Sequence, residues 1–343
     1  MKKVLFILKE RHYSQAKTSY GLINSASLVA DYLSKHGYEC EVVSVIDANF
    51  IDKEIHLFKP DMVIIEALWV PTYKLEELIS IKRNKNIKWV VRVHSDIGFL
   101  SAETQGIRFL NEYADLHKKN LIIAANSEKF VEVISRTLGH KFYYLPNLVA
   151  LLRHHHDHND ILEEHDHINI GCFGAMRLLK NQCFQALCSI EAANYLGKKL
   201  YFHITPNLGI ENDPVLANLI EIFKNSIHDL VIHDWLPNDE FQHLVRRMDI
   251  GIQLSFTESF NIVSADFINN NRLVAVSDAI DWLPAIVRAS TTDYDDAIRK
   301  IIYAYRHRNS EIIKEKEKDS LNKYNEDSKK HWADFLQMYP HKH

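Results

Sequence analysis

The chain of 343 residues lacks any long apolar run. No stretch approaches the roughly 18 apolar residues that a membrane-spanning helix requires, so we expect a soluble protein. The N-terminal sequence, MKKVLFILKERH, contains one apolar run of five residues. This run is shorter than the roughly 7–15 residues of a signal-peptide core, and we interpret it as a first buried strand.

A strong charge imbalance is also absent. Lys and Arg number 41 and Asp and Glu number 45, which gives a net charge of −4 and no global basic field that would attract nucleic acid. The four cysteines form no C-x-x-C pair and lie in mostly apolar surroundings; they are Cys40, Cys172, Cys183 and Cys188. We interpret them as buried thiols of a reduced, cytoplasmic protein.

Two ligand-binding motifs are missing. The P-loop pattern G-x-x-x-x-G-K-[ST] does not occur, which excludes that mode of phosphate binding. We recognise no metal-binding Asp-x-Asp motif, and we therefore expect no obligatory metal.

The first half of the chain alternates apolar runs with helical patterns. The apolar runs cover 4–8, 41–45, 62–68, 88–94 and 120–127, and the helical patterns cover 23–37, 73–85 and 128–139. This alternation predicts a doubly wound parallel sheet, in which ligands bind beyond the carboxyl ends of the strands. The rule directs attention to His94 and to the loops 10–21 and 66–71.

The composition changes after residue 150. Residues 153–167, RHHHDHNDILEEHDH, contain six histidines among several acids and show no apolar period. We interpret 151–168 as a linker between two domains. A metal site is the alternative, because imidazole and carboxylate groups are suitable ligands, but no regular pattern fixes their geometry.

The second half repeats the α/β pattern. Its predicted strands are 168–175, 199–205, 229–235, 250–254 and 273–276, and its predicted helices are 181–197, 214–226 and 239–248. We therefore predict an N-terminal α/β domain, 1–150, and a C-terminal α/β domain, 169–325. The charged tail carries spaced Trp332, Phe335 and Leu336, which predicts one or two helices, with 326–343 packing on the first domain.

Two acids near a short predicted helix indicate a ligand site. Glu258 precedes this helix and Asp266 lies about two turns along it. Carboxylates in these positions suit a ligand with several hydroxyls, such as a sugar joined to a nucleotide. The backbone N–H groups of Ser259, Phe260 and Asn261, at the positive end of the helix, suit phosphates.

A second candidate phosphate site lies in the sequence GCFGAMRLLKNQ. It places Gly174, Arg177 and Lys180 between a strand and the following helix. Small residues let the backbone approach a phosphate, and the two cations can neutralise a diphosphate. An ordinary turn with solvated cations is the alternative.

Together these motifs resemble the donor-binding half of GT-B glycosyltransferases, in particular their large fourth family of retaining enzymes. The resemblance rests on Gly174 with Lys180 six residues later, and on the run HDWLPNDEFQHLVRRMDIGIQLSFTESFNIVSADF. It implies two Rossmann-like domains that face each other across a cleft, with the acceptor on the first domain and a nucleotide-sugar donor on the second.

The resemblance also implies roles for individual residues. Lys180 matches a lysine that contacts the donor diphosphate, Glu258 an acid beside the transferred sugar, and Asp266 an acid that binds the ribose. The amides of 259–261 match a turn that meets the sugar and phosphates. His94 resembles a histidine that faces the donor sugar and diphosphate, and the catalytic set would be His94, Glu258, Lys180 and Arg177.

The sequence departs from the family pattern in four ways. Ala175 stands where the family has an arginine, so Arg177 would have to supply that charge, and Asp266 replaces a glutamate. Ser259 and Asn261 replace glycines of the turn, which leaves less room for close backbone approach. The Gly-Gly loop usual after the first strand is missing, with only Gly21 nearby.

The implied function is transfer of a sugar from a nucleoside-diphosphate sugar, with UDP favoured, to an acceptor hydroxyl with retention of configuration. A glycan or a small molecule is the default acceptor. The stretch RVHSDIGFLSAETQGIRFL resembles phage-encoded transferases, which makes a hydroxymethylated base in DNA the other acceptor considered. Two functions stay open as alternatives: a nucleotide-sugar epimerase or phosphorylase on the same fold, and a non-catalytic binding subunit.

Overall fold

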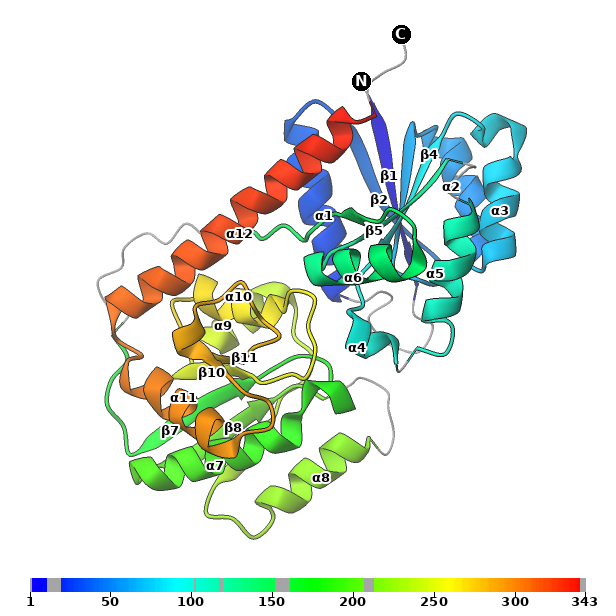
Figure 1. Ribbon diagram of the computed structural model, residues 1–343. Coiled ribbons are helices and arrows are strands. Elements are labelled where there is room, and N and C mark those ends of the chain that lie inside the picture. Colours follow the sequence, from blue (N-terminus) through cyan, green and yellow to red (C-terminus); the bar gives the residue numbers. More distant parts are fainter. Residues whose placement is uncertain are drawn as a thin grey trace. The chain divides into compact units, whose positions relative to one another are not determined.

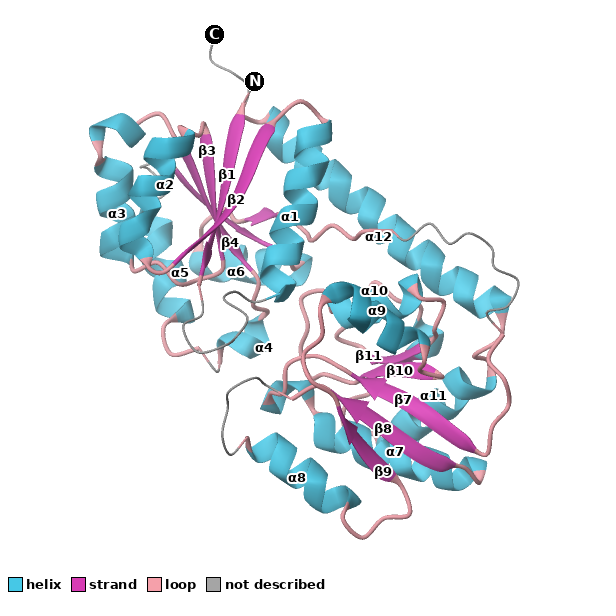
Figure 2. Ribbon diagram, turned by 180° about the vertical axis from the view of Figure 1, so that it is seen from behind, coloured by secondary structure: helices cyan, strands magenta, loops and turns pink. Residues whose placement is uncertain are grey.

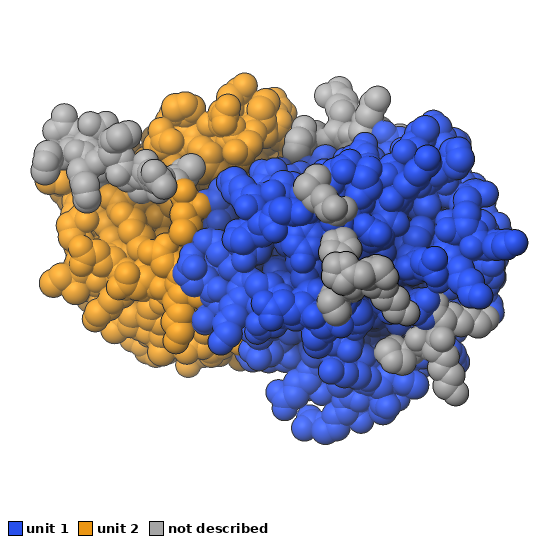
Figure 3. Space-filling model, turned by 90° about the horizontal axis from the view of Figure 1, so that it is seen from above, with its two compact units in different colours: residues 1–150, 325–343 blue, residues 151–324 orange. Residues whose placement is uncertain are grey.

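The computed structural model describes residues 2–10, 20–101, 103–116, 120–151, 161–206 and 213–339. The chain divides into two compact units (Figure 3): unit 1 comprises residues 1–150 and 325–343, and unit 2 comprises residues 151–324. Each unit is built on a six-stranded sheet whose paired strands all run parallel (Figure 2). The predicted α/β class with two doubly wound sheets is confirmed.

The sheet of unit 1 has the strand order β2-β1-β3-β4-β5-β6. Its strands are β1 (Lys3–Lys9), β2 (Glu39–Val45), β3 (Met62–Glu66), β4 (Lys88–Val93), β5 (Leu121–Ala125) and β6 (Tyr143–Tyr144). The apolar runs of β3 and β5 are buried along their whole length, as expected for strands covered on both faces.

Alternate side chains of these strands enter two different cores, one on each face of the sheet. Helices cover both faces (Figure 1). Phe6, Ile64 and Val90 pack with α1 (Tyr20–Lys35) and with the C-terminal part of α12 (Glu311–Gln337). Ile7 and Val63 point to the other face. That face is covered by α2 (Ile51–Phe58), α3 (Thr72–Ser80), α5 (Gly106–Asp115) and α6 (Glu128–Leu138).

The sheet of unit 2 has the order β12-β11-β10-β7-β8-β9. Its strands are β7 (His167–Cys172), β8 (Lys199–Ile204), β9 (Asp229–Ile232), β10 (Ile250–Gln253), β11 (Val274–Ser277) and β12 (Arg288–Ala289). Counted from β7, this is the order of dinucleotide-binding sheets, and the direction of winding reverses between β7 and β10.

Helices cover both faces of this second sheet. One face packs against α7 (Gln182–Leu196), α8 (Pro214–Phe223) and α11 (Tyr294–Arg306). The other face carries α9 (Asn238–Arg246) and α10 (Ile262–Asn269), whose aromatic side chains Phe241 and Phe267 contact Phe173. The predicted short helix that carries Asp266 is α10.

Two glycines allow α10 to lie close to the sheet. A Cβ atom on Gly251 would lie 2.6 Å from the ring of Phe267, and one on Gly171 would lie 2.7 Å from it. Side chains at these strand positions would push the helix away, because buried rings have no space to yield. The glycines therefore fix the distance between α10 and the sheet.

Some predicted segments end earlier in the structure than the sequence suggests. The helix predicted over 73–85 ends at Ser80 and is followed by a short 3-10 turn, Lys82–Asn84, because the Asn84 amide donates to the carbonyl of Leu78 at 2.9 Å. The strand predicted over 229–235 ends at Ile232. The tail, for which one or two helices are predicted, forms the single helix α12.

Helix α12 contributes residues to both units. In unit 2, the Glu317 carboxylate accepts from the backbone N–H of Val274 at 3.3 Å. In unit 1, the Asn325 side chain accepts from the N–H of Val149 at 2.9 Å, and the buried Trp332 donates to the carbonyl of Pro146 at 2.8 Å. None of the helices among the described residues is long and apolar enough to cross a membrane.

Replacing Gly251 with alanine tests the close approach of α10. We expect Gly251→Ala to lower the free energy of unfolding by about 1–3 kcal/mol, because its Cβ overlaps the ring of Phe267. Gly21→Ala is the matched control, since nothing lies within 4 Å of a Cβ there, and it should leave stability unchanged or slightly higher. Urea denaturation measures both; equal effects would contradict the packing argument.

Candidate active site

The candidate site lies where the winding of the second sheet reverses. β7 and β10 are neighbours, yet the loop after β7 leads to α7 and the loop after β10 leads to α10. These helices pack on opposite faces, so the two loops leave the carboxyl edge of the sheet toward opposite faces. Doubly wound sheets bind ligands beside such reversals of the winding.

The loop after β7 has a fixed backbone. Gly174 has a φ of +104°, a conformation that side chains strain, and its N–H donates to the Thr205 hydroxyl at 3.1 Å. Residues Leu178–Lys180 form a 3-10 turn, and the carbonyl of Lys180 accepts from the side chain of Gln185 at 2.6 Å. This backbone directs the Lys180 side chain to Glu258 on the loop after β10, while Arg177 is exposed.

Lys180 and Glu258 form an ion pair across the two loops. The Lys180 Nζ lies 2.5 Å from Glu258 Oε1, and the two side chains are 26% and 9% exposed. The loops are also joined through their backbones, because the N–H of Phe256 donates to the carbonyl of Leu179 at 2.9 Å. Partial burial strengthens the attraction between the opposite charges relative to a solvated pair.

Asn261 organises the turn before α10. Its φ of 66° is left-handed, a region that asparagine enters more readily than most residues. Its side-chain oxygen accepts from the N–H of Ser264 at 2.8 Å and caps the helix. Its side-chain N–H₂ group donates to Glu258 Oε1 and to Gln253 Oε1, both at 2.9 Å. Asparagine therefore gives this turn the left-handed backbone of a glycine and also holds Glu258 in place.

An aromatic stack supports the same turn. The Phe260 ring stacks on both Trp282 and Tyr324, with centroid distances of 5.3 Å and 4.5 Å, and these two rings also contact each other at 5.9 Å. The Trp282 indole donates to the carbonyl of Phe260 at 2.7 Å. Among the described residues, the backbone N–H groups of Phe260 and Asn261 donate to no protein acceptor. They lie at the positive end of α10, on the same turn as Ser259, and can bind an anion.

Asp266 lies further along α10 and has different partners. Its carboxylate accepts from the side chain of Gln242 on α9 at 2.9 Å, and Gln242 in turn accepts from Asn270. Burial raises the pKa of Asp266 to about 7, although the Gln242 hydrogen bond opposes this shift. A ligand that donates hydroxyl hydrogens to this carboxylate would favour its charged form.

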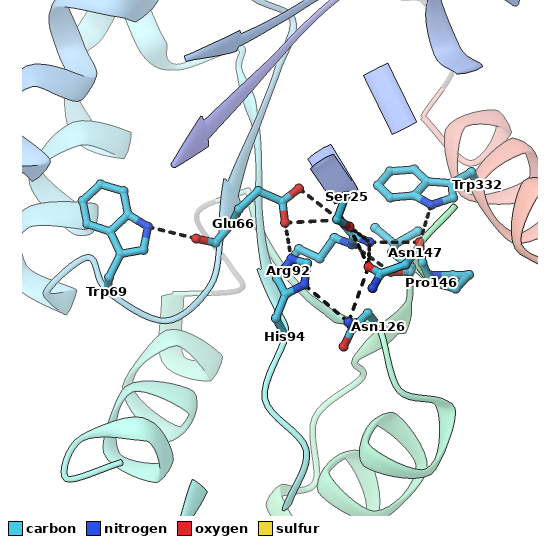
Figure 4. A network of polar contacts seen from close by, with 10 residues as sticks. Ser25, Glu66, Trp69, Arg92, His94, Asn126, Pro146, Asn147 and Trp332 are labelled. Carbon is cyan, nitrogen blue, oxygen red and sulfur yellow. Dashed lines mark hydrogen bonds and ion pairs between the residues drawn. The ribbon is translucent and has the colours of Figure 1, made fainter. Parts of the chain in front are cut away.

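His94 belongs to unit 1, where it follows β4. Its Nε2 is bonded to a carboxylate oxygen of Glu66, and its Nδ1 lies 3.3 Å from the amide nitrogen of Asn126. Glu66 is also paired with the buried Arg92 (Figure 4). Burial lowers the pKa of His94, against the opposing charge of Glu66.

Within unit 2, Lys180 and Asn261 both bond to Glu258, whereas Asp266 contacts Gln242. His94 belongs to unit 1.

Two polar side chains inside buried strands were not singled out from the sequence. They are Gln253 in β10, which accepts from Asn261, and Arg92 in β4, which pairs with Glu66. A polar residue inside an apolar run was the available signal. Glu66 begins the loop 66–71, to which the sequence directs attention.

The chain does contain one Asp-x-Asp triplet, Asp293-Tyr294-Asp295. The structure places it at the start of α11, where the Asp293 side chain accepts from the N–H of Asp296 at 3.0 Å as a helix cap. Within the described part of the chain, no group of three or more His, Cys, Asp or Glu side chains is arranged to hold a metal ion. Most of the histidine-rich segment, residues 152–160, lies outside the described residues.

The fold matches solved structures with two such sheets. Sucrose-phosphate synthase from Thermosynechococcus elongatus aligns with a TM-score of 0.73 and 10% identity, over 98% of this chain and 99% of that one. A glycosyltransferase from Rickettsia africae aligns with a TM-score of 0.64 and 15% identity, over 96% and 98% of the two chains. The resemblance to GT-B glycosyltransferases is therefore confirmed for the fold.

Two further matches carry ligands in their descriptions. An α-glucosyltransferase in complex with UDP and a 13-mer DNA containing an HMU base aligns with a TM-score of 0.63 and 14% identity, over 94% of each chain. A mutant of S. aureus TarM, in complex with UDP among other ligands, aligns with a TM-score of 0.59 and 11% identity, over 80% of this chain and 54% of its own. The chain thus spans about half the length of TarM. No family model and no curated protein matches the sequence.

The raised pKa of Asp266 predicts how stability depends on pH. An unfolded aspartate ionises near pH 4, whereas the folded one ionises near pH 7, so the folded state should lose stability as the pH rises between these values. The full loss would be about 4 kcal/mol, from a shift of roughly three pKa units. Asp266→Asn should remove this loss of stability. Asp278→Asn, at an exposed position, is the control and should retain it. Urea denaturation at pH 5 and pH 8 measures the effect; identical pH profiles for Asp266→Asn and the unmodified protein would refute it.

Proposed function

We propose that the protein is a glycosyltransferase that moves a sugar from a nucleoside-diphosphate sugar to an acceptor hydroxyl. The observation that carries the proposal is the joining of Lys180, Glu258 and the N-terminal turn of α10 at the winding reversal of a GT-B sheet. Cation, acid and helix amides at one crevice suit a ligand that is both anionic and rich in hydroxyls.

The leaving diphosphate is the group that these residues would stabilise. Breaking the bond between the sugar and the diphosphate increases negative charge on the phosphate while the anomeric carbon becomes cationic. Lys180 and the amides of Phe260 and Asn261 would stabilise that negative charge from fixed positions, with Arg177 as a second, exposed cation. Because these groups are already placed, they need little reorganisation during the reaction.

Glu258 is assigned to the sugar. Its Oε1 is shared by Lys180 and Asn261, which fixes the carboxylate beside the phosphate groups. A fixed carboxylate can accept hydrogen bonds from two neighbouring hydroxyls. Asp266, further along α10, is assigned to the ribose.

The proposal also covers the nucleotide, the stereochemistry and the acceptor. UDP is the favoured nucleotide, supported by the UDP named for two structures of the same fold. We also propose that the sugar is transferred with retention of configuration, that the reaction requires no metal, and that the protein is cytoplasmic. Unit 1 would carry the acceptor, for which a glycan or small molecule is the first candidate and a hydroxymethylated base in DNA the second.

A thermal-shift panel tests donor binding. We expect UDP and UDP-sugars to raise the melting temperature by several degrees at saturating concentration, and Lys180→Ala to abolish most of that rise by removing the phosphate cation. Lys199→Ala is the matched control, because Lys199 pairs with Asp229 at the opposite edge of the same sheet. Stabilisation by none of UDP, ADP, GDP and their sugars would refute the assigned donor site.

Product analysis separates transfer from the other reactions of a sugar nucleotide. With an acceptor hydroxyl present, the proposal requires a new glycoside and free UDP in equal amounts. Conversion of the sugar nucleotide into its epimer without any acceptor would indicate an epimerase instead. A sugar phosphate formed only with added phosphate would indicate a phosphorylase.

The pH dependence of nucleotide affinity tests the ribose assignment. Since Asp266 ionises near pH 7, ribose hydroxyls should find an acceptor carboxylate only above that pH, and UDP affinity should rise as the pH increases through 7. The 2′,3′-dideoxy analogue is the control, because it keeps the phosphates but lacks the donating hydroxyls. Calorimetric titration at pH 6 and pH 8 measures both ligands; equal pH dependence would contradict the assignment.

A further inference from the structure

A buried charge network lies at the carboxyl edge of the sheet in unit 1 (Figure 4). Arg92 in β4 and Glu66 at the end of β3 are both fully buried and paired at 3.1 Å. His94, two residues after Arg92, is the member whose side chain reaches solvent, with 12% of it exposed. A buried ion pair is costly to desolvate, so its retention beside an accessible histidine needs a reason.

The guanidinium of Arg92 is held in one orientation. Its Nε donates to the carbonyl of Leu145 at 2.8 Å, and its Nη2 donates to the carbonyl of Pro146 at 3.0 Å and to the Asn147 side-chain oxygen at 2.6 Å. Trp332 of α12 donates to the same Pro146 carbonyl, and its ring lies 5.3 Å from the guanidinium. Only Nη1 of Arg92 is directed at Glu66.

Glu66 therefore stays ionised. Burial alone would raise its pKa, but the charge of Arg92 and the hydrogen bonds from Arg92 and His94 outweigh this and hold the pKa below its usual value. An ionised carboxylate only accepts hydrogen bonds. The Nε2 atom of His94, which is bonded to Glu66, must accordingly carry the proton.

The other nitrogen of His94 then has a lone pair. Burial lowers the pKa of His94 and keeps the ring neutral, so a proton on Nε2 leaves Nδ1 as an acceptor. The Asn126 side chain agrees with this assignment. Its amide nitrogen lies 3.4 Å from the Asn147 oxygen, which already accepts from Arg92, so the same N–H₂ group faces Nδ1 at 3.3 Å.

We infer that Glu66, oriented by Arg92, is a positioning residue that fixes His94 as a hydrogen-bond acceptor at Nδ1, so that His94 recognises a substrate hydroxyl and not a phosphate oxygen. The inference rests on the proposed function for the identity of the substrate. It replaces the sequence-based role of His94, which included contact with the donor diphosphate. A phosphate oxygen offers no hydrogen to an acceptor, whereas a sugar or acceptor hydroxyl does.

The contact between Asn126 and Nδ1 of His94 is long. At 3.3 Å it is longer than the usual 2.9–3.0 Å of an N–H donor bond. A hydroxyl at the usual distance would make a better bond with Nδ1. Asn126 thus maintains the orientation of the ring in the absence of substrate.

Nitrogen NMR of histidine-labelled protein reads the tautomer directly. We expect the His94 ring, identified by the signals lost in His94→Gln, to carry its proton on Nε2 throughout pH 6–8. Glu66 is bonded to the ring and Arg92 to Glu66, while nearby Asp96 binds Ser127 at 3.3 Å and Glu103 binds Ser95 at 2.8 Å. A proton on Nδ1 in the unmodified protein would overturn the inference, with no variant required.

Glu66→Gln should reverse the tautomer. Arg92 would draw the new amide oxygen toward itself, which turns the amide N–H₂ group toward Nε2 and moves the ring proton to Nδ1. We expect transfer to the acceptor to fall about 10-fold or more, because Nδ1 would then be a donor. Glu103→Gln is the matched control, since it removes a carboxylate near His94 that is bonded to Ser95, and both tautomer and turnover should be retained.

These experiments distinguish failure of the His94 role from failure of the proposed glycosyl transfer. Full turnover in Glu66→Gln with the reversed tautomer would overturn the role of His94 as an acceptor. No turnover of any sugar nucleotide by the unmodified protein would refute the proposed function, while the spectrum would still report whether Glu66 fixes the ring.

Discussion

Every strand pair in the two sheets is parallel, and the sites depend on this constraint. Parallel pairing brings the carboxyl ends of all strands in a sheet to one edge, with helices on both faces. In unit 2 the winding reverses between β7 and β10, so Lys180 and Glu258 form an ion pair although 78 residues separate them. In unit 1 the same geometry joins Glu66 and His94, which are 28 residues apart. The chemistry of each unit is thus concentrated at one end of its sheet.

Polar residues within buried strands support both sites. Gln253 in β10 accepts from Asn261, which holds Glu258, and Arg92 in β4 holds Glu66, which holds His94. Burying such groups costs free energy unless each is hydrogen-bonded, and here the charged pair is satisfied by backbone carbonyls and by Asn147. The residues that would contact substrate therefore rely on a second set of buried residues for their orientation.

Helix α12 supports a site in each unit. Its residue Tyr324 packs on Phe260 behind the turn that carries the amides for phosphate, and its residue Trp332 packs on Arg92 behind the histidine network. The sequence predicted an apolar face on this tail from the spacing of Trp332, Phe335 and Leu336. It did not predict that the indole of Trp332 would donate to the loop that fixes Arg92, because that contact joins residues 186 positions apart.

The sequence by itself determined the α/β class, the short helix that carries Asp266 and the resemblance to the GT-B fold, because apolar periods and short motifs are local properties of the chain. Tertiary structure decided the rest. It decided that α10 approaches the sheet over Gly171 and Gly251, that burial raises the pKa of Asp266, and that Glu66 sets the tautomer of His94. These properties arise from desolvation and from contacts between distant segments, and only the packed sheet brings those segments together.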